Sequence, residues 1–298
     1  EEWTQKLMEP HYDGRNVPIS EKVGITAGMS MTEKQGGSDV RANTTIAKPM
    51  DALKTGPGHS YLLTGHKWFT SAPMSDGFLT LAKIKGTEGL SCFLVPRWLP
   101  DGTRNTGFRI MRLKDKLADK ANASSEVEYE RAWSMLLGEE GKGVKQIIEM
   151  VQSTRLDCIL GSAGGIRRSL QHAVNHTSNR SAFGDLLINQ PLMQNLLADL
   201  SVESEAHTMG VMSVAQMFDK ASERKVELSN EEMAFLRVGI PCLKYFTTKR
   251  APQFVYECME VFGGNGFVED FPMARLFRQS PLNSIWEGSG NVIALDIV

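Results

Sequence analysis

One carboxylate near the end of the chain has neighbours of the kind that support acid–base chemistry. Glu287 stands between Trp286 and Gly288, within residues 283–291. A carboxylate among apolar groups loses hydration and becomes a better proton acceptor, which suits general-base work. The spacing of Ser284 and Glu287 also fits the S-x-x-E capping box that opens a helix. This segment alone therefore leaves two interpretations open, a general base and a helix cap.

A second stretch of unusual composition lies far upstream, at residues 29–40, with the sequence MSMTEKQGGSDV. Its core has the pattern T-E-x-x-x-G-S-D. Four further motifs follow in the order G-x-K at 65–67, R-x-x-F-G at 180–184, G-G-N-G at 263–266 and E-G-S at 287–289. Glycines in such motifs let backbone N–H groups approach a bound ligand closely. The motifs therefore predict a ligand site assembled from distant parts of the chain.

Together the five motifs resemble those of the acyl-CoA dehydrogenase family of flavoproteins. The sequences of residues 31–40 and 283–291 resemble those of the AidB-like branch of that family. This resemblance covers nearly the whole chain. It implies an α+β fold in which an antiparallel β-barrel or sandwich is followed by an antiparallel four-helix bundle. It also implies FAD as cofactor and an acyl-CoA thioester as substrate.

The pattern of apolar and turn residues predicts the same organisation. We expect a connecting segment at 1–21, a β-rich domain at 22–135 and a helical domain at 136–298, with a glycine-rich hinge at 138–143. Strand segments are predicted at 25–31, 39–48, 60–67, 77–85, 90–96 and 108–113. Helices are predicted from about 147, from Pro191, from the capping box Ser229–Glu232 with kinks at Pro241 and Pro252, and from about Ser284.

Composition excludes several classes of protein. The 298 residues carry a net charge of −2, and no apolar run is long enough to span a bilayer. Four cysteines lack disulfide or metal spacing, and His172 and His176 lack a third ligand, so no metal is expected. The cysteine pattern favours a reduced compartment, and the sequence leaves the intracellular location, cytoplasmic or mitochondrial, open. The chain begins without Met and ends within a predicted helix, so we expect the middle and C-terminal part of a longer protein.

By resemblance, Glu287 is the base that removes the α-proton, and Arg155 orders it. Some family members place the base directly before this arginine, where Thr154 stands here. Cofactor contacts are implied for Met29, Met31, Thr32, Gly37, Ser38, Trp68, Phe69, Ser71, Arg180, Phe183, Gln190, Gly264, Trp286, Ser289 and Asn291. Either Trp68 or Phe69 stacks on the flavin, since a one-residue bulge exchanges their roles. Arg180 and Phe183 are implied to reach the flavin of a neighbouring subunit, which predicts a homodimer or homotetramer.

The resemblance supports two classes of function. The first is α,β-dehydrogenation of an acyl-CoA, with hydride transfer to flavin N5, or oxidation if oxygen reaches the reduced flavin. The second is a flavoprotein whose main role is binding, either of DNA in the alkylation response or of fatty acyl-CoA, with weak dehydrogenase activity. These residues show no dense basic stripe for DNA, so DNA binding would require a further C-terminal domain. The acyl chain length stays open.

Overall fold

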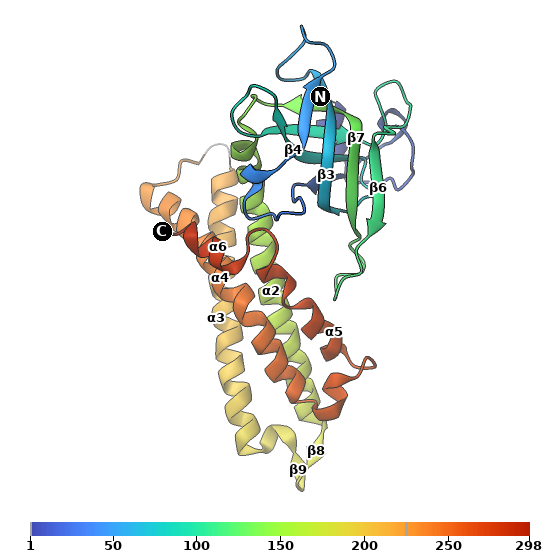
Figure 1. Ribbon diagram of the computed structural model, residues 1–298. Coiled ribbons are helices and arrows are strands. Elements are labelled where there is room, and N and C mark those ends of the chain that lie inside the picture. Colours follow the sequence, from blue (N-terminus) through green and yellow to red (C-terminus); the bar gives the residue numbers. More distant parts are fainter. Residues whose placement is uncertain (1, 224–225) are drawn as a thin grey trace. The chain divides into compact units, whose positions relative to one another are not determined.

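The computed structural model of the chain describes residues 2–223 and 226–298 (Figure 1). Contacts group the chain into two compact units, Glu1–Met150 and Val151–Val298. Within the described ranges, no helix combines the length and the apolar character that a membrane span requires.

The first unit is a barrel-like β-sheet. Its strands are β1 (Ala27–Ser30), β2 (Ile46–Pro49), β3 (Ser60–Ser71), β4 (Gly77–Ile84), β5 (Ser91–Pro96), β6 (Phe108–Leu113) and β7 (Ser124–Leu137). The pairings β4–β2, β2–β3, β3–β7, β7–β5 and β5–β4 form a closed ring, to which β1 and β6 add as flanking strands (Figure 1). Closure pairs strand edges that would otherwise be exposed. The interior is filled by aromatic and aliphatic side chains, including Tyr61, Phe93 and Tyr129.

The predicted α+β fold is confirmed, with a correction to the sheet. Strand β4 pairs in parallel with both β1 and β2, so the sheet is mixed and not purely antiparallel. Apolar alternation shows which face of a strand is buried, but it carries no information on the direction of the partner strand. The central strand β7 was missed, because Glu126, Glu128 and Glu130 dilute its apolar pattern.

The predicted strand at 39–48 is also wrong in extent. Residues Val40–Ala42 form a 3-10 turn, and the strand begins only at Ile46. The cause is a side chain from elsewhere, because the Glu33 carboxylate accepts hydrogen bonds from the backbone N–H groups of Thr44 and Thr45. Those two amides are therefore not free to extend the ladder.

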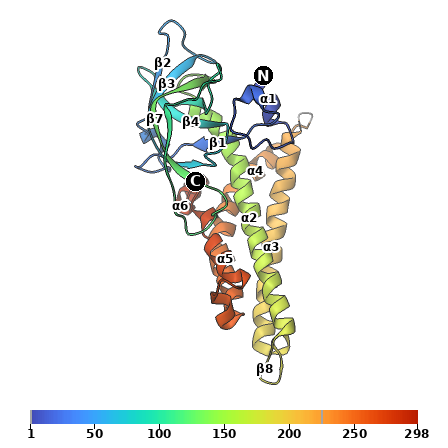
Figure 2. The ribbon, with the colours of Figure 1, turned by 90° about the vertical axis from the view of Figure 1, so that its right-hand side faces the viewer.

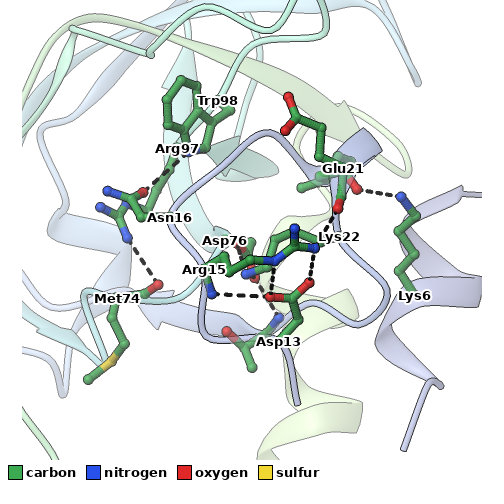
Figure 3. A network of polar contacts seen from close by, with 12 residues as sticks. Lys6, Asp13, Arg15, Asn16, Glu21, Lys22, Met74, Asp76, Arg97 and Trp98 are labelled. Atoms are coloured by element: carbon green, nitrogen blue, oxygen red, sulfur yellow. Dashed lines mark hydrogen bonds and ion pairs between the residues drawn. The ribbon is translucent and has the colours of Figure 1, made fainter. Parts of the chain in front are cut away.

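The N-terminal segment is bound to the barrel by buried and polar contacts. It contains α1 (Glu2–Leu7) and a 3-10 turn at Ile19–Glu21. Lys22 Nζ donates to both oxygens of Asp76 at 2.7 and 2.9 Å, and both residues are buried (Figure 3). Trp98 Nε1 donates to Asn16 Oδ1 at 3.3 Å. The segment is thus anchored next to the start of β4 and the end of β5.

The helices are α2 (Gly143–Asn179), α3 (Pro191–Ser222), α4 (Asn230–Glu260), α5 (Pro272–Gln279) and α6 (Gly290–Leu295). The long helices α2, α3 and α4 run side by side in both views (Figures 1 and 2). A short hairpin, β8 (Ser181–Ala182) and β9 (Asp185–Leu186), follows α2. The helix start at Pro191 and the capping box of Ser229 and Glu232 are confirmed.

One expectation about the helices is wrong. After α4, the 3-10 turn Gly263–Phe267 precedes α5, and the 3-10 turn Leu282–Ser284 separates α5 from α6. The last helix begins at Gly290, not near Ser284, and Ser284 Oγ donates to the Pro281 carbonyl. Glu287 and Gly288 have φ angles of 57° and 99°, which a right-handed helix excludes. The helix-cap interpretation of Glu287 is therefore wrong.

Candidate active site

Two of the sequence motifs meet as a buried ion pair inside the barrel. Lys67 Nζ lies 3.0 Å from Glu33 Oε1, and the Lys67 side chain has no exposed surface. Glu33 also accepts from Thr45 Oγ1 at 2.6 Å. Burial alone would raise the pKa of Glu33, but the bonds from Thr44 and Thr45 and the charge of Lys67 together hold that pKa well below its ordinary value. The T-E and G-x-K motifs therefore share a structural role.

A β-bulge follows Lys67 in β3. Lys67 pairs with Val127 and Thr70 pairs with Ser125, so β3 has one residue more than β7 between these pairs. Lys67 and Thr70 are both buried, whereas Trp68 is partly exposed and Phe69 is 45% exposed. The bulge considered from the sequence is present. Because it leaves both aromatic side chains accessible, the choice between them as the flavin contact stays open.

The predicted ring contacts of the first unit lie around this bulge. Trp68 donates its backbone N–H to the Thr32 carbonyl at 2.8 Å, which joins the M-T-E segment to β3. Lys114 Nζ lies 3.1 Å from the centre of the Trp68 ring. A Cβ atom on Gly37 would lie 2.7 Å from Thr32 Oγ1, so a glycine is needed for this close approach. The structure thus brings Thr32, Gly37 and Trp68 together.

Met29 lies in the neighbouring strand β1, and Ser71 is the last residue of β3. A Cβ atom on Gly28 would lie 2.9 Å from the Ser71 carbonyl oxygen, so β1 passes close to the end of β3. Met29 and Met31 are partly buried, and Ser38 is exposed in the turn after Gly37. Ser71 follows the bulge in β3. Met31 and Ser38 flank the segment that contains Thr32 and Gly37.

In the second unit, Glu287 is held by two neighbouring residues of α2. Thr154 Oγ1 donates to Glu287 Oε2 at 2.8 Å, and Arg155 Nε donates to the Glu287 carbonyl at 3.1 Å. Arg155 also forms an ion pair with Asp296 at 2.8 Å. The left-handed backbone of Glu287 is uncommon for a residue with a side chain and is typical of functional sites. Arg155 was predicted from the sequence, whereas the contact of Thr154 was not.

Lys244 is a further residue of this group that sequence reasoning missed. Its Nζ donates to the carbonyls of Asn283 at 2.6 Å, Trp286 at 3.0 Å and Gly288 at 3.2 Å. Burial lowers the pKa of Lys244. The signal in the sequence is a lysine on the buried face of α4, one turn after Ile240, where an apolar residue is expected.

The loop around Glu287 is also bound by its own side chains. Trp286 Nε1 donates to Asn283 Oδ1 at 2.9 Å, and Asn283 Nδ2 donates to the Cys158 carbonyl and to Ser162 Oγ on α2. Trp286 is therefore fixed within the loop. Ser289 and Asn291 stand at the start of α6, directly after Gly288.

The remaining predicted contacts form a second group at the far end of α2. Arg180 and Phe183 belong to the β8–β9 hairpin, and Gln190 Nε2 donates to the Ala182 carbonyl at 3.3 Å. Phe183 is 95% exposed. The His176 ring stacks on Phe262 with 4.3 Å between ring centres, which brings the turn containing Gly264 toward the same end of α2.

This second group is remote from Glu287 within one chain. Helix α2 continues for 24 residues from Arg155 to Asn179 without interruption. At a rise of about 1.5 Å per residue, the two groups are separated by roughly 36 Å along the helix. Within one chain, these predicted cofactor contacts therefore fall into two separate groups.

Comparison with known proteins identifies the family. The family models "Acyl-CoA dehydrogenase, middle domain" and "Acyl-CoA dehydrogenase, C-terminal domain" match residues 28–132 and 141–298. AidB of Escherichia coli is 45% identical over 298 residues, which are 100% of this chain and 52% of AidB. The structure of Caenorhabditis elegans ACDH-11 in complex with C11-CoA is 34% identical with a TM-score of 0.84, over 92% of this chain and 46% of that chain.

An acyl-CoA dehydrogenase from Bacillus anthracis, solved in complex with FAD, shares the fold. Its TM-score is 0.78 at 24% identity, over 91% of this chain and 46% of that chain. The chain thus spans about half the length of the first relatives it matches. The domain matches, the fold and the motif order agree, and the chain belongs to the acyl-CoA dehydrogenase family.

Proposed function

We propose that the protein catalyses FAD-dependent α,β-dehydrogenation of an acyl-CoA thioester, with Glu287 as the base. The observation that carries this proposal is the state of the Glu287 carboxylate. Oε2 is held by Thr154, while Oε1 has no protein partner among the residues that the structure describes. One oxygen thus fixes the side chain and the other is available to accept the α-proton.

The backbone amide of Glu287 would donate a hydrogen bond to the thioester carbonyl oxygen. The amide of Glu287 donates to no protein group in residues 2–223 and 226–298. A fixed N–H donor stabilises the negative charge that develops on the thioester oxygen when the α-proton leaves. Base and donor would then come from one residue.

The described residues fit an isoalloxazine ring. Trp68 and Phe69 offer accessible aromatic surface on the bulge, and Thr32 supplies a hydroxyl beside them. When bound, FAD supplies the hydride acceptor that side chains lack. The complex of ACDH-11 with C11-CoA supports an acyl-CoA thioester as the substrate class.

We further propose a homodimer or homotetramer in which cofactor contacts are shared. The separation of roughly 36 Å along α2 supports this, because Arg180, Phe183 and Gln190 are too far along α2 to join the Glu287 group of their own chain. A symmetric assembly would place the hairpin of one subunit at the cofactor of another. The high exposure of Phe183 is consistent with such a contact.

The test is anaerobic flavin bleaching by a panel of straight and branched acyl-CoA thioesters, comparing the parent protein with Glu287→Gln. This change keeps the shape but removes the base, so bleaching should slow on the order of 10²–10⁴-fold while bound FAD is retained. Glu231→Gln, at an exposed position of α4, is the matched control and should bleach like the parent. Equal bleaching by Glu287→Gln contradicts the assignment. Tight acyl-CoA binding without bleaching in the parent would favour a binding role.

A further inference from the structure

Three consecutive backbone carbonyls of the Glu287 loop are held by cationic side chains. Lys244 Nζ binds the carbonyls of Trp286 and Gly288, and Arg155 Nε binds the carbonyl of Glu287 between them. The Lys244 ammonium uses its third N–H on Asn283, and the residue is only 1% exposed. Among the described residues no carboxylate lies within ion-pair distance of Lys244. This ammonium is therefore bound by the loop backbone alone.

The contact between Lys244 and the Trp286 carbonyl determines where the Glu287 N–H points. All described peptide bonds are trans, so the C=O and N–H of one peptide group point in opposite directions. The carbonyl of Trp286 and the amide of Glu287 belong to the same peptide group. Because Lys244 holds that carbonyl, the Glu287 N–H points away from Lys244. It is this N–H that has no protein acceptor.

We propose that Lys244 is a positioning residue that orients the Trp286–Glu287 peptide, so that the amide of the base faces the thioester oxygen of the substrate. The ammonium also polarises this peptide group, which strengthens its N–H as a donor. This inference rests on the proposed function, because it assigns the amide to the oxyanion of that reaction.

The surroundings of Lys244 argue against a purely structural role. Its charged and titratable neighbours are Cys158 and Arg155 on α2 and Glu287 in the loop, and Arg155 is in turn paired with Asp296 after α6. Burying an ammonium without a carboxylate is unfavourable, and an apolar side chain would fill the space at lower cost. A buried charge that binds the loop carrying the base indicates a role in the site.

The experiment uses a 3-oxoacyl-CoA bound to the FAD-loaded protein, because its acidic α-carbon forms an enolate without hydride transfer. The midpoint pH of enolate formation is followed by absorbance for the parent, Lys244→Met and the control Lys83→Met, an exposed lysine in β4. Loss of one oxyanion donor weakens stabilisation on the order of 10²-fold, so Lys244→Met should raise the midpoint by roughly one to two pH units. Lys83→Met should match the parent.

Amide hydrogen exchange of residues 283–290 is the second readout. It should accelerate in Lys244→Met and stay unchanged in Lys83→Met. A midpoint and an exchange rate equal to those of the parent would overturn the inference. If Lys244→Met does not fold, Lys244→Gln, which keeps two N–H donors but no charge, carries the same comparison with the same outcomes. A parent protein that forms the enolate but is not bleached by any acyl-CoA refutes the dehydrogenase proposal, while the Lys244 comparison still decides the inference.

Discussion

Removal of the Lys67 ammonium should destabilise the barrel strongly. In Lys67→Met the Glu33 carboxylate stays buried without its charge partner, and the Leu81 carbonyl, now bonded to Lys67 Nζ at 2.9 Å, loses its donor. Breaking a fully buried ion pair by removing one partner costs about 3–5 kcal/mol. Since Glu33 keeps its bonds from Thr44 and Thr45, we expect a loss at the lower end, about 3 kcal/mol.

Urea unfolding of the FAD-loaded protein at neutral pH measures this loss. The matched control is Lys83→Met, an exposed lysine in β4, which should change the free energy of unfolding by less than about 0.5 kcal/mol. Glu33→Gln should also destabilise, because it leaves the Lys67 charge unpaired. The double variant should be less destabilised than the sum of the two, because the second change removes the charge that the first left alone.

The pH dependence gives a second check. The folded-state pKa of Glu33 is lowered from its ordinary value of 4.5, so its contribution to stability is fully present above that value. It is lost as the pH falls through the lower folded-state pKa. Below about pH 4.5 the parent should therefore lose stability more steeply than Glu33→Gln. A Lys67→Met variant within about 1 kcal/mol of the parent, with an unchanged acid slope, would refute the reasoning.

Three further outcomes are expected. Arg180→Ala should purify with little FAD, at a cost on the order of 2–5 kcal/mol in cofactor binding, and a monomeric parent that keeps stoichiometric FAD through gel filtration would contradict this. Gly288→Ala should slow bleaching on the order of 10²-fold, because a Cβ would lie 2.7 Å from Ile293 Cδ1 and displace the base, whereas Gly164→Ala, with open space around it, should not. Asp76→Asn should expose residues 8–26 to faster limited proteolysis, since it removes the negative charge and one of the two oxygens that bind the buried Lys22 ammonium; unchanged cleavage would argue against the anchor.

Part of the fold could be predicted from the sequence, because it depends on interactions between neighbouring residues. Proline fixes its own φ angle and a capping box satisfies amides within one turn, so the helix starts at Pro191 and after Ser229 follow from neighbouring residues alone. The spacing of Ser284 and Glu287 also matches a capping box, but it was misleading because it considers neighbouring residues alone. It does not reveal that Glu287 adopts a left-handed backbone, which depends on contacts from α2 and α4.

The strand partners were decided at longer range. The bulge at Trp68 and Phe69 exists only relative to β7, more than fifty residues away, so β3 by itself could suggest it but not establish it. The parallel pairing of β4 with β1 and β2 depends likewise on how the barrel closes. The direction in which two strands pair depends on which strand edges remain free when the ring forms. The sequence of a single segment does not contain this information.

The sequence by itself determined the family, the identity of the candidate base and the order of the motifs, because these reside in short runs of residue types. Only the tertiary structure showed that Glu33 pairs with Lys67, and that Thr154 and Lys244 hold Glu287 and its loop. Thr154 and Glu287 are 133 positions apart. Such contacts depend on which helix faces pack together, and a buried lysine differs from a surface lysine only in what the fold places around it.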